Sequence, residues 1–176
     1  MASFTERIVG AAKLDVRVYE EVEADRGATG QAMAVVLLAS LSGGIGAAGV
    51  GSGGLSGFAF AGIAALIGWG SWAFLTYVIG TRLLPEPGTR ADVGELLRTT
   101  GFAQAPGILR IVGALAGVGP FILAIVSIWM IVAMVIAVRQ ALDFTSTFRA
   151  VGVVLVGWVI SVLITLALLG VGAGVG

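Results

Sequence analysis

Residues Pro120 to Val138 form an uninterrupted apolar run that ends at Arg139. As an α-helix rising about 1.5 Å per residue, this run reaches roughly 28 Å, which matches the hydrocarbon thickness of a bilayer. Pro120 suits the first turn of a helix, where its missing N–H costs nothing, and Arg139 can extend its guanidinium back to the lipid headgroups. The run therefore predicts a transmembrane helix.

The composition extends this prediction to most of the chain and excludes several kinds of chemistry. The chain is 58% hydrophobic and 11% charged, which is too apolar for one water-soluble core. Its zero net charge provides no broad basic surface for nucleic acid, and the absence of Cys and His removes thiolate nucleophiles and the usual transition-metal ligands. We predict no enzymatic activity, no cofactor, no bound metal and no small-molecule substrate.

The apolar runs predict an all-α, polytopic membrane protein with five transmembrane helices. A short amphipathic cytoplasmic segment, residues 1–30, precedes a membrane domain of residues 31–176. The five spans are predicted at 31–50, 58–81, 104–119, 120–138 and 148–170. The third is the weakest, because it is short and contains Arg110. It crosses the membrane if the bilayer thins locally, or it forms half of a tight hairpin with 120–138.

The basic residues predict the orientation of these spans. All ten precede the first span, lie in or beside the second loop, or flank the fourth loop: Arg7, Lys13, Arg17, Arg26, Arg82, Arg90, Arg98, Arg110, Arg139 and Arg149. The first loop, the third loop and the C-terminal tail contain no Lys or Arg. We therefore predict a multi-pass protein of the inner (cytoplasmic) membrane of the cell. By the positive-inside rule, its N-terminus is cytoplasmic and its C-terminus lies outside. Arg110 is then expected near the inner interface, where it can reach the headgroups.

The N-terminal segment has the pattern of two short helices. Phe4 and Ile8 share one face of the first, and Asp15 is expected to break the pattern and cap the second. The pair either docks a partner or lies against the protein's own membrane domain. The acidic run between Glu20 and Asp25 is expected to be a solvated face.

Small residues spaced by four mark possible helix–helix contacts in the last span. Gly157, Ser161 and Thr165 form such a stripe, which serves either packing within the chain or a partner interface. Trp129 and Trp158 lie deeper than the interfacial belt where Trp is usual. They either pack in the core or stack on a lipid, quinone or pigment of a larger assembly. Our candidates for a partner interface are Gly157, Ser161, Thr165, Trp129, Trp158, Phe4 and Ile8.

Three stretches carry a resemblance to a known family. They are YEEVEADRGATGQAMAVVLLASLSGGIG from Tyr19, ELLRTTGFAQAPGIL from Glu95, and RQALDFTSTFRAVGVVLVGW from Arg139. In order and character they resemble the bacterial branch of the YIP1 family, over most of the chain. The resemblance implies a five-span protein with a cytoplasmic N-terminus, whose eukaryotic relatives act in vesicle trafficking by binding small GTPases and membrane-shaping proteins. The N-terminal region of this chain is much shorter than theirs.

These observations favour a noncatalytic membrane protein that organises lipid or partner membrane proteins, as a YIP1-like scaffold or adaptor. Its expected partners are the lipid bilayer and other membrane proteins or a second copy of itself. An accessory subunit of a larger energy-transducing or photosynthetic complex is one alternative, and a small transporter or channel is another. The transporter alternative is disfavoured because all ten acidic residues lie outside the predicted spans, which leaves no carboxylate there to relay protons or bind a cation.

Overall fold

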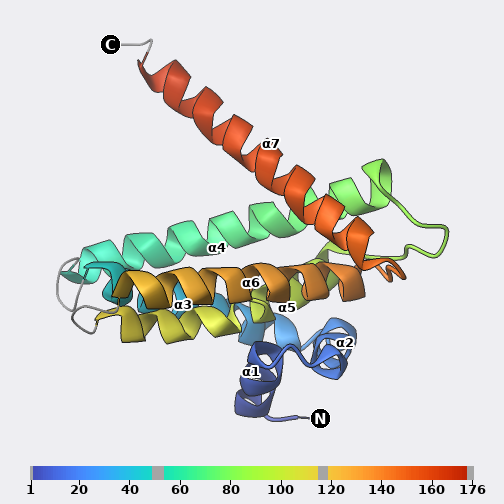
Figure 1. Cartoon of the computed structure of the whole chain (residues 1–176), viewed down its shortest axis with the longest axis horizontal. Coiled ribbons are helices and arrows are strands. Elements are labelled where there is room, and N and C mark those ends of the chain that lie inside the picture. Colours follow the sequence, from blue (N-terminus) through green and yellow to red (C-terminus); the bar gives the residue numbers. More distant parts are fainter. Residues whose placement is uncertain (1, 49–53, 115–118, 174–176) are drawn as a thin grey trace.

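Helices account for nearly all of the chain that the computed structural model describes, which is residues 2–48, 54–114 and 119–173 (Figure 1). In chain order they are α1 (Phe4–Ala12), α2 (Val16–Ala24), α3 (Ala28–Ala48), α4 (Gly54–Val78), the π-helix η1 (Ile79–Leu83), α5 (Val93–Phe102), the 3₁₀-helix η2 (Ala105–Ala114), α6 (Gly119–Ala141) and α7 (Thr147–Ala173). The predicted all-α class is confirmed.

Four helical segments among the described residues are long and apolar enough to cross a membrane. They are Ala28–Gly46, Ser56–Leu83, Gly119–Ala141 and Thr147–Ala167. These segments correspond to the spans predicted at 31–50, 58–81, 120–138 and 148–170. The protein is therefore a multi-pass membrane protein.

The stretch predicted as a third span at 104–119 has a different structure from the other four. After α5 the chain forms η2, a 3₁₀-helix, and residues 115–118 lie outside the described part. A 3₁₀-helix rises about 2.0 Å per residue, so ten residues cover roughly 20 Å instead of the 15 Å of an α-helix. η2 lies against α3 and α6 and runs antiparallel to α6 (Figure 1). The described residues thus contain no fifth long α-helix, and the five-span count remains a prediction.

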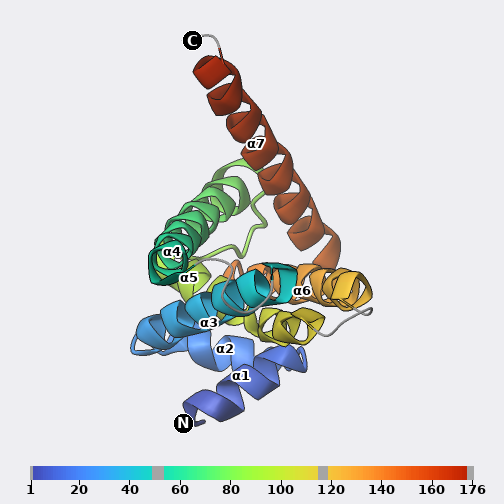
Figure 2. The same cartoon turned by 90° about the vertical axis from the view of Figure 1, so that its left-hand side faces the viewer.

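The last helix, α7, stands away from the other membrane helices. Figures 1 and 2 show it leaving the group formed by α3, α4, α6 and η2 at a wide angle. Near its start, Ala150 and Val153 are buried in a cluster with Ile79 of η1 and Leu142. Beyond Ile160 the helix leaves this cluster and most of its large side chains are exposed.

The N-terminal helices dock onto the protein's own membrane domain. Tyr19 and Val22 of α2 are fully buried in a cluster that also contains Val35 of α3 and Phe102 of α5. The Tyr19 hydroxyl donates a hydrogen bond of 3.1 Å to the Ala11 carbonyl and so joins α2 to α1. The predicted break between the two helices is confirmed.

The caps of these helices are set by local sequence. Asp15 is the N-cap of α2, as predicted, and accepts a hydrogen bond from the backbone N–H of Arg17. Ser3 and Glu6 form a capping box at the start of α1, in which each side chain accepts a hydrogen bond from the other residue's N–H. The N-terminal ends of both helices are therefore capped by side chains close to them in the sequence.

Candidate functional site

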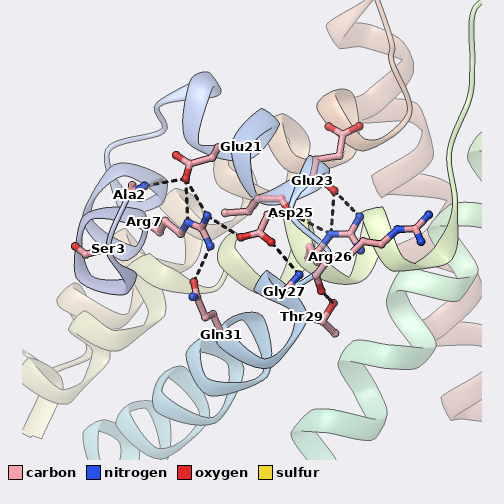
Figure 3. Close-up of polar contacts among 12 residues, drawn as sticks. Ala2, Ser3, Arg7, Glu21, Glu23, Asp25, Arg26, Gly27, Thr29 and Gln31 are labelled. Atoms are coloured by element: carbon pink, nitrogen blue, oxygen red, sulfur yellow. Dashed lines mark hydrogen bonds and ion pairs between the residues drawn. The ribbon is translucent and has the colours of Figure 1, made fainter.

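A buried arginine joins the N-terminal helices to the start of α3 (Figure 3). Arg7 of α1 is 1% exposed. Its Nη2 donates to Glu21 Oε1 at 2.8 Å and to Asp25 Oδ2 at 2.8 Å, and its Nη1 donates to Gln31 Oε1 at 3.0 Å. One side chain thus binds α1, α2 and α3 to one another.

This arrangement corrects the prediction that the acidic run from Glu20 to Asp25 is a solvated face. The guanidinium of Arg7 lowers the pKa of the Glu21 carboxyl, and the same contact lowers the pKa of Asp25. Glu20 accepts a hydrogen bond of 3.0 Å from Gln140 Nε2 at the end of α6. The acidic residues therefore hold the N-terminal helices in place.

A second buried arginine caps the C-terminus of α2. Arg98 of α5 is 5% exposed, and its Nε donates to the carbonyls of Val22 at 3.0 Å and Glu23 at 2.9 Å. The last carbonyls of a helix have no partner within the helix and carry partial negative charge, so a cation there stabilises the helix end. Arg98 thereby connects α2 to α5.

An acidic pocket of about 700 Å³ opens beside this contact. Glu20, Glu23, Glu95 and Asp143 contribute carboxylates to its lining, together with Arg139. Burial raises the pKa of Glu23 to about 7, with further contributions from the charges of Asp143 and Glu95. No group of three or more Asp or Glu residues within the described ranges has the geometry to hold a metal ion.

The segment between η1 and α5 caps α7. Glu86 Oε2 accepts hydrogen bonds from the Thr145 N–H at 3.0 Å and the Thr145 hydroxyl at 2.8 Å, and its Oε1 accepts one from the Ser146 N–H at 3.3 Å. Arg149 Nη1 donates to the Pro85 carbonyl at 2.6 Å. A carboxylate at the positive end of a helix is favourable, so Glu86 fixes the start of α7.

Arg110 lies deep among the apolar helices. Its Nη2 donates a hydrogen bond of 3.4 Å to Ser127 Oγ, which is about 12 Å from the start of α6 and 21 Å from its end at 1.5 Å per residue. Its side chain runs past Gly43 of α3, where an added Cβ would lie 3.6 Å from Arg110 Cδ. The expectation that Arg110 extends to the inner interface is wrong, because η2 packs its backbone against Gly46, near the end of α3 that is remote from the N-terminal helices.

The predicted interface residues lie in three different places. Gly157 is buried, and an added Cβ would meet Trp72 at 3.2 Å. Trp158 and Thr165 are exposed and, with Ser161, line a shallow groove of about 220 Å³ on the C-terminal half of α7. Trp129 lines a separate apolar groove on α6 and η2.

Phe4 and Ile8 lie in the third place, at the opposite end of the chain. Both are half-buried and pack against the core cluster of α1, α2, α3 and α5. The structure thus brings Trp158, Ser161 and Thr165 together and keeps Trp129, Phe4 and Ile8 apart from them.

These features define a polytopic all-α membrane protein with an ordered polar end and no catalytic constellation among its described side chains. The family model of the Yip1 domain matches residues 16–169, so the chain belongs to the Yip1 domain family. This is a family of membrane proteins involved in trafficking and partner interactions. No curated protein and no solved structure matches the chain.

Proposed function

We propose that this protein is a noncatalytic scaffold that organises partner membrane proteins, with the outer half of α7 as its docking surface. The observation that carries the proposal is the separation of α7 from the other helices. Its inner half is held by Ala150, Val153 and Gly157, whereas Trp158 is 61% exposed and Leu163 is 59% exposed. A helix that leaves its own bundle presents a whole face for another helix to cover.

The small residues of α7 suit a close helix–helix contact. Ser161 and Thr165 lie four residues apart in the groove beside Trp158. The Thr165 hydroxyl already donates to the Ser161 carbonyl at 2.9 Å, so this hydroxyl stays paired when the groove is buried. In lipid, small side chains allow backbones to approach and to gain van der Waals contact. The expected partner is a transmembrane helix of another protein or of a second copy of this one.

We expect Ser161→Leu to weaken this association, because a larger side chain fills the groove and separates the two helices. The loss should be about tenfold or more in affinity, comparable to other overpacked contacts. Val159→Leu is the matched control, since Val159 lies on nearly the opposite side of α7 and is also exposed. Co-purification in mild detergent and energy transfer between labelled proteins in vesicles measure the association. Equal association of both variants and the wild type would contradict the proposed surface.

A specific observation favours the transporter alternative, which therefore remains a second candidate. Arg110 is a charged residue in the interior of the membrane domain, and such residues often mark solute pathways. Flux through liposomes that depends on Arg110 would support this alternative over a scaffold. An accessory subunit of a larger energy-transducing or photosynthetic complex would use the same face of α7 as the scaffold.

We infer that the polar end of the molecule is cytoplasmic. The contacts of Arg98 with α2, of Gln140 with Glu20 and of Glu86 with Thr145 hold the N-terminal helices, α5 and the turn before α7 at one end. With Arg110 set apart, all nine remaining basic residues belong to these segments or to their immediate neighbours. The positive-inside rule favours the cytoplasm for such an end.

This orientation predicts which sites in the protein react with an impermeant maleimide added outside intact cells. A single cysteine at Thr89 or Ser146 should stay unlabelled, because both belong to the polar end. A cysteine at Ser52 or Gly174 should react, because the predicted five-span topology places the loop after the first span and the C-terminal tail outside. Both positions lie outside the described residues. Labelling at Ser146 from outside would exclude the five-span topology, and permeabilised cells provide the control for accessibility.

A further inference from the structure

Arg110 lies between two open cavities of the membrane domain. One, of about 330 Å³, lies toward α3 and α4 and is lined by Val36, Ser40 and Trp69 among others. The second, of about 510 Å³, lies toward α6 and α7. Arg110, Trp72 and Met134 line both cavities, and the Trp72 indole N–H donates to Met134 Sδ at 3.3 Å between them.

The larger cavity is apolar except at one point. Its lining is Trp72, Arg110, Ser127, Met130, Ile131, Met134, Val154, Leu155 and Trp158. Arg110 and Ser127 are the polar side chains of this set, and the Ser127 hydroxyl already donates to the Leu123 carbonyl at 2.7 Å. The chamber is open on one side, where Ile131, Leu155 and Trp158 are more than half exposed, and it contains a single cationic group.

The guanidinium of Arg110 has more hydrogen-bonding capacity than the protein uses. It has five N–H donors, and within the described residues its one hydrogen bond is the long one to Ser127. No acidic residue can neutralise it inside the bundle, because all ten lie outside the four long apolar helices and η2. A cation held in low dielectric without an anion is unfavourable, so binding an anion there stabilises it.

We propose that this chamber binds a single-chain anionic lipid, a fatty acid whose carboxylate pairs with Arg110 and whose acyl chain lies along the apolar wall. The planar guanidinium matches a carboxylate through two parallel N–H···O bonds. The apolar walls of α6 and α7 provide contact for a hydrocarbon chain and no polar groups that would replace the hydration of an inorganic anion.

The size of the chamber favours one acyl chain. Its volume lies within the range of about 300–1,000 Å³ that is typical of drug-sized ligands, and a two-chain phospholipid is larger than such a ligand. This site shares Trp158 with the groove at Ser161, but its cationic group, Arg110, lines this site and not that groove.

The chamber contains its own reporter, because Trp72 and Trp158 line it. Bromine atoms on an acyl chain quench tryptophan fluorescence on contact. We expect dibromostearate, added at pH 8 to the protein in phosphatidylcholine nanodiscs, to quench the fluorescence saturably. Its methyl ester, which has the same chain and no charge, should need about a tenfold or greater excess for the same quenching, as expected for the loss of a charge-assisted hydrogen bond.

The variants test whether Arg110 is responsible. Arg110→Gln should lose the preference for the acid over the ester, whereas Arg82→Gln, which alters an exposed arginine of η1, should keep it. Trp158→Phe should remove part of the quenching and Trp129→Phe should not. If Arg110→Gln does not fold, the comparison of acid with ester on the wild type still decides. Equal quenching by the ester, competition by inorganic phosphate as strong as by stearate, or a phospholipid bound in place of the fatty acid in native mass spectra would each overturn the proposal.

Discussion

Gly46→Ala is expected to separate α3 from η2 and to destabilise the membrane domain. An added Cβ at this position would lie 1.9 Å from the Arg110 carbonyl oxygen and 2.8 Å from its carbonyl carbon. Both are backbone atoms, so no side-chain rotation relieves the clash, and one of the two helices must move. Overpacking of this kind costs about 1–3 kcal/mol or more. Thermal unfolding in detergent, followed by helical circular dichroism, measures the loss.

Gly44→Ala is the matched control for this experiment. Gly44 belongs to the same helix, and nothing lies within 4 Å of the position of its added Cβ. Alanine favours a helix over glycine by about 1 kcal/mol, so this variant should be as stable as the wild type or slightly more stable. If Gly46→Ala unfolds at the same temperature as Gly44→Ala, η2 does not pack on α3 as the structure has it.

The long apolar helices were predictable because lipid imposes a simple requirement. A backbone in hydrocarbon must satisfy its own hydrogen bonds, and a run such as 120–138 can do so only as a helix. The structure of the segment at 104–119 is harder to predict, because it depends on the helices that pack against it. η2 fits against α3 at the missing side chain of Gly46. The sequence places Gly46 four positions after another small residue, Ser42, but does not show which helix covers this pair.

The roles of the arginines depended on contacts far apart in sequence. Arg98 donates a hydrogen bond to the carbonyl of Glu23, which lies 75 positions earlier in the sequence. Neither composition nor a helical pattern predicts which residues so far apart will meet. Arg110 was expected to reach the headgroups because long basic side chains near a helix end usually do. The close contact of its backbone with Gly46 instead fixes it among the membrane helices.

One signal for Arg7 was present in the sequence. Arg7 follows Phe4 by three positions and precedes Ala11 by four, so it lies on the apolar stripe of α1 and not on its polar face. Glu21 and Asp25 are also four positions apart and share one face of the next helix. A charged residue on an apolar stripe, with two acids in register on the neighbouring helix, predicts a buried ion pair.

Arg7→Met is expected to release the N-terminal helices from the bundle. The substitution keeps an apolar stem and removes the charge, so Glu21 and Asp25 lose their partner and Gln31 loses a donor. Breaking a buried ion pair costs about 3–5 kcal/mol, and the lower value is expected here because both carboxylates are partly exposed. Faster hydrogen exchange across residues 4–24, with slow exchange kept in α3 and α6, measures this release.

Arg17→Met is the control that separates burial from charge. Arg17 also pairs with a carboxylate, Asp15, at 2.9 Å, but its side chain is 87% exposed, and an exposed pair contributes little. Because Arg7 lowers the pKa of Glu21 and Asp25, the docking energy that it provides is complete above their unfolded pKa values. It is lost as the pH falls through their lower pKa values in the folded protein. The wild type and Arg17→Met should therefore lose protection of residues 4–24 in acid, whereas Arg7→Met should exchange fast at both pH values. Equal exchange in the two variants at neutral pH would mean that the buried cluster does not hold these helices.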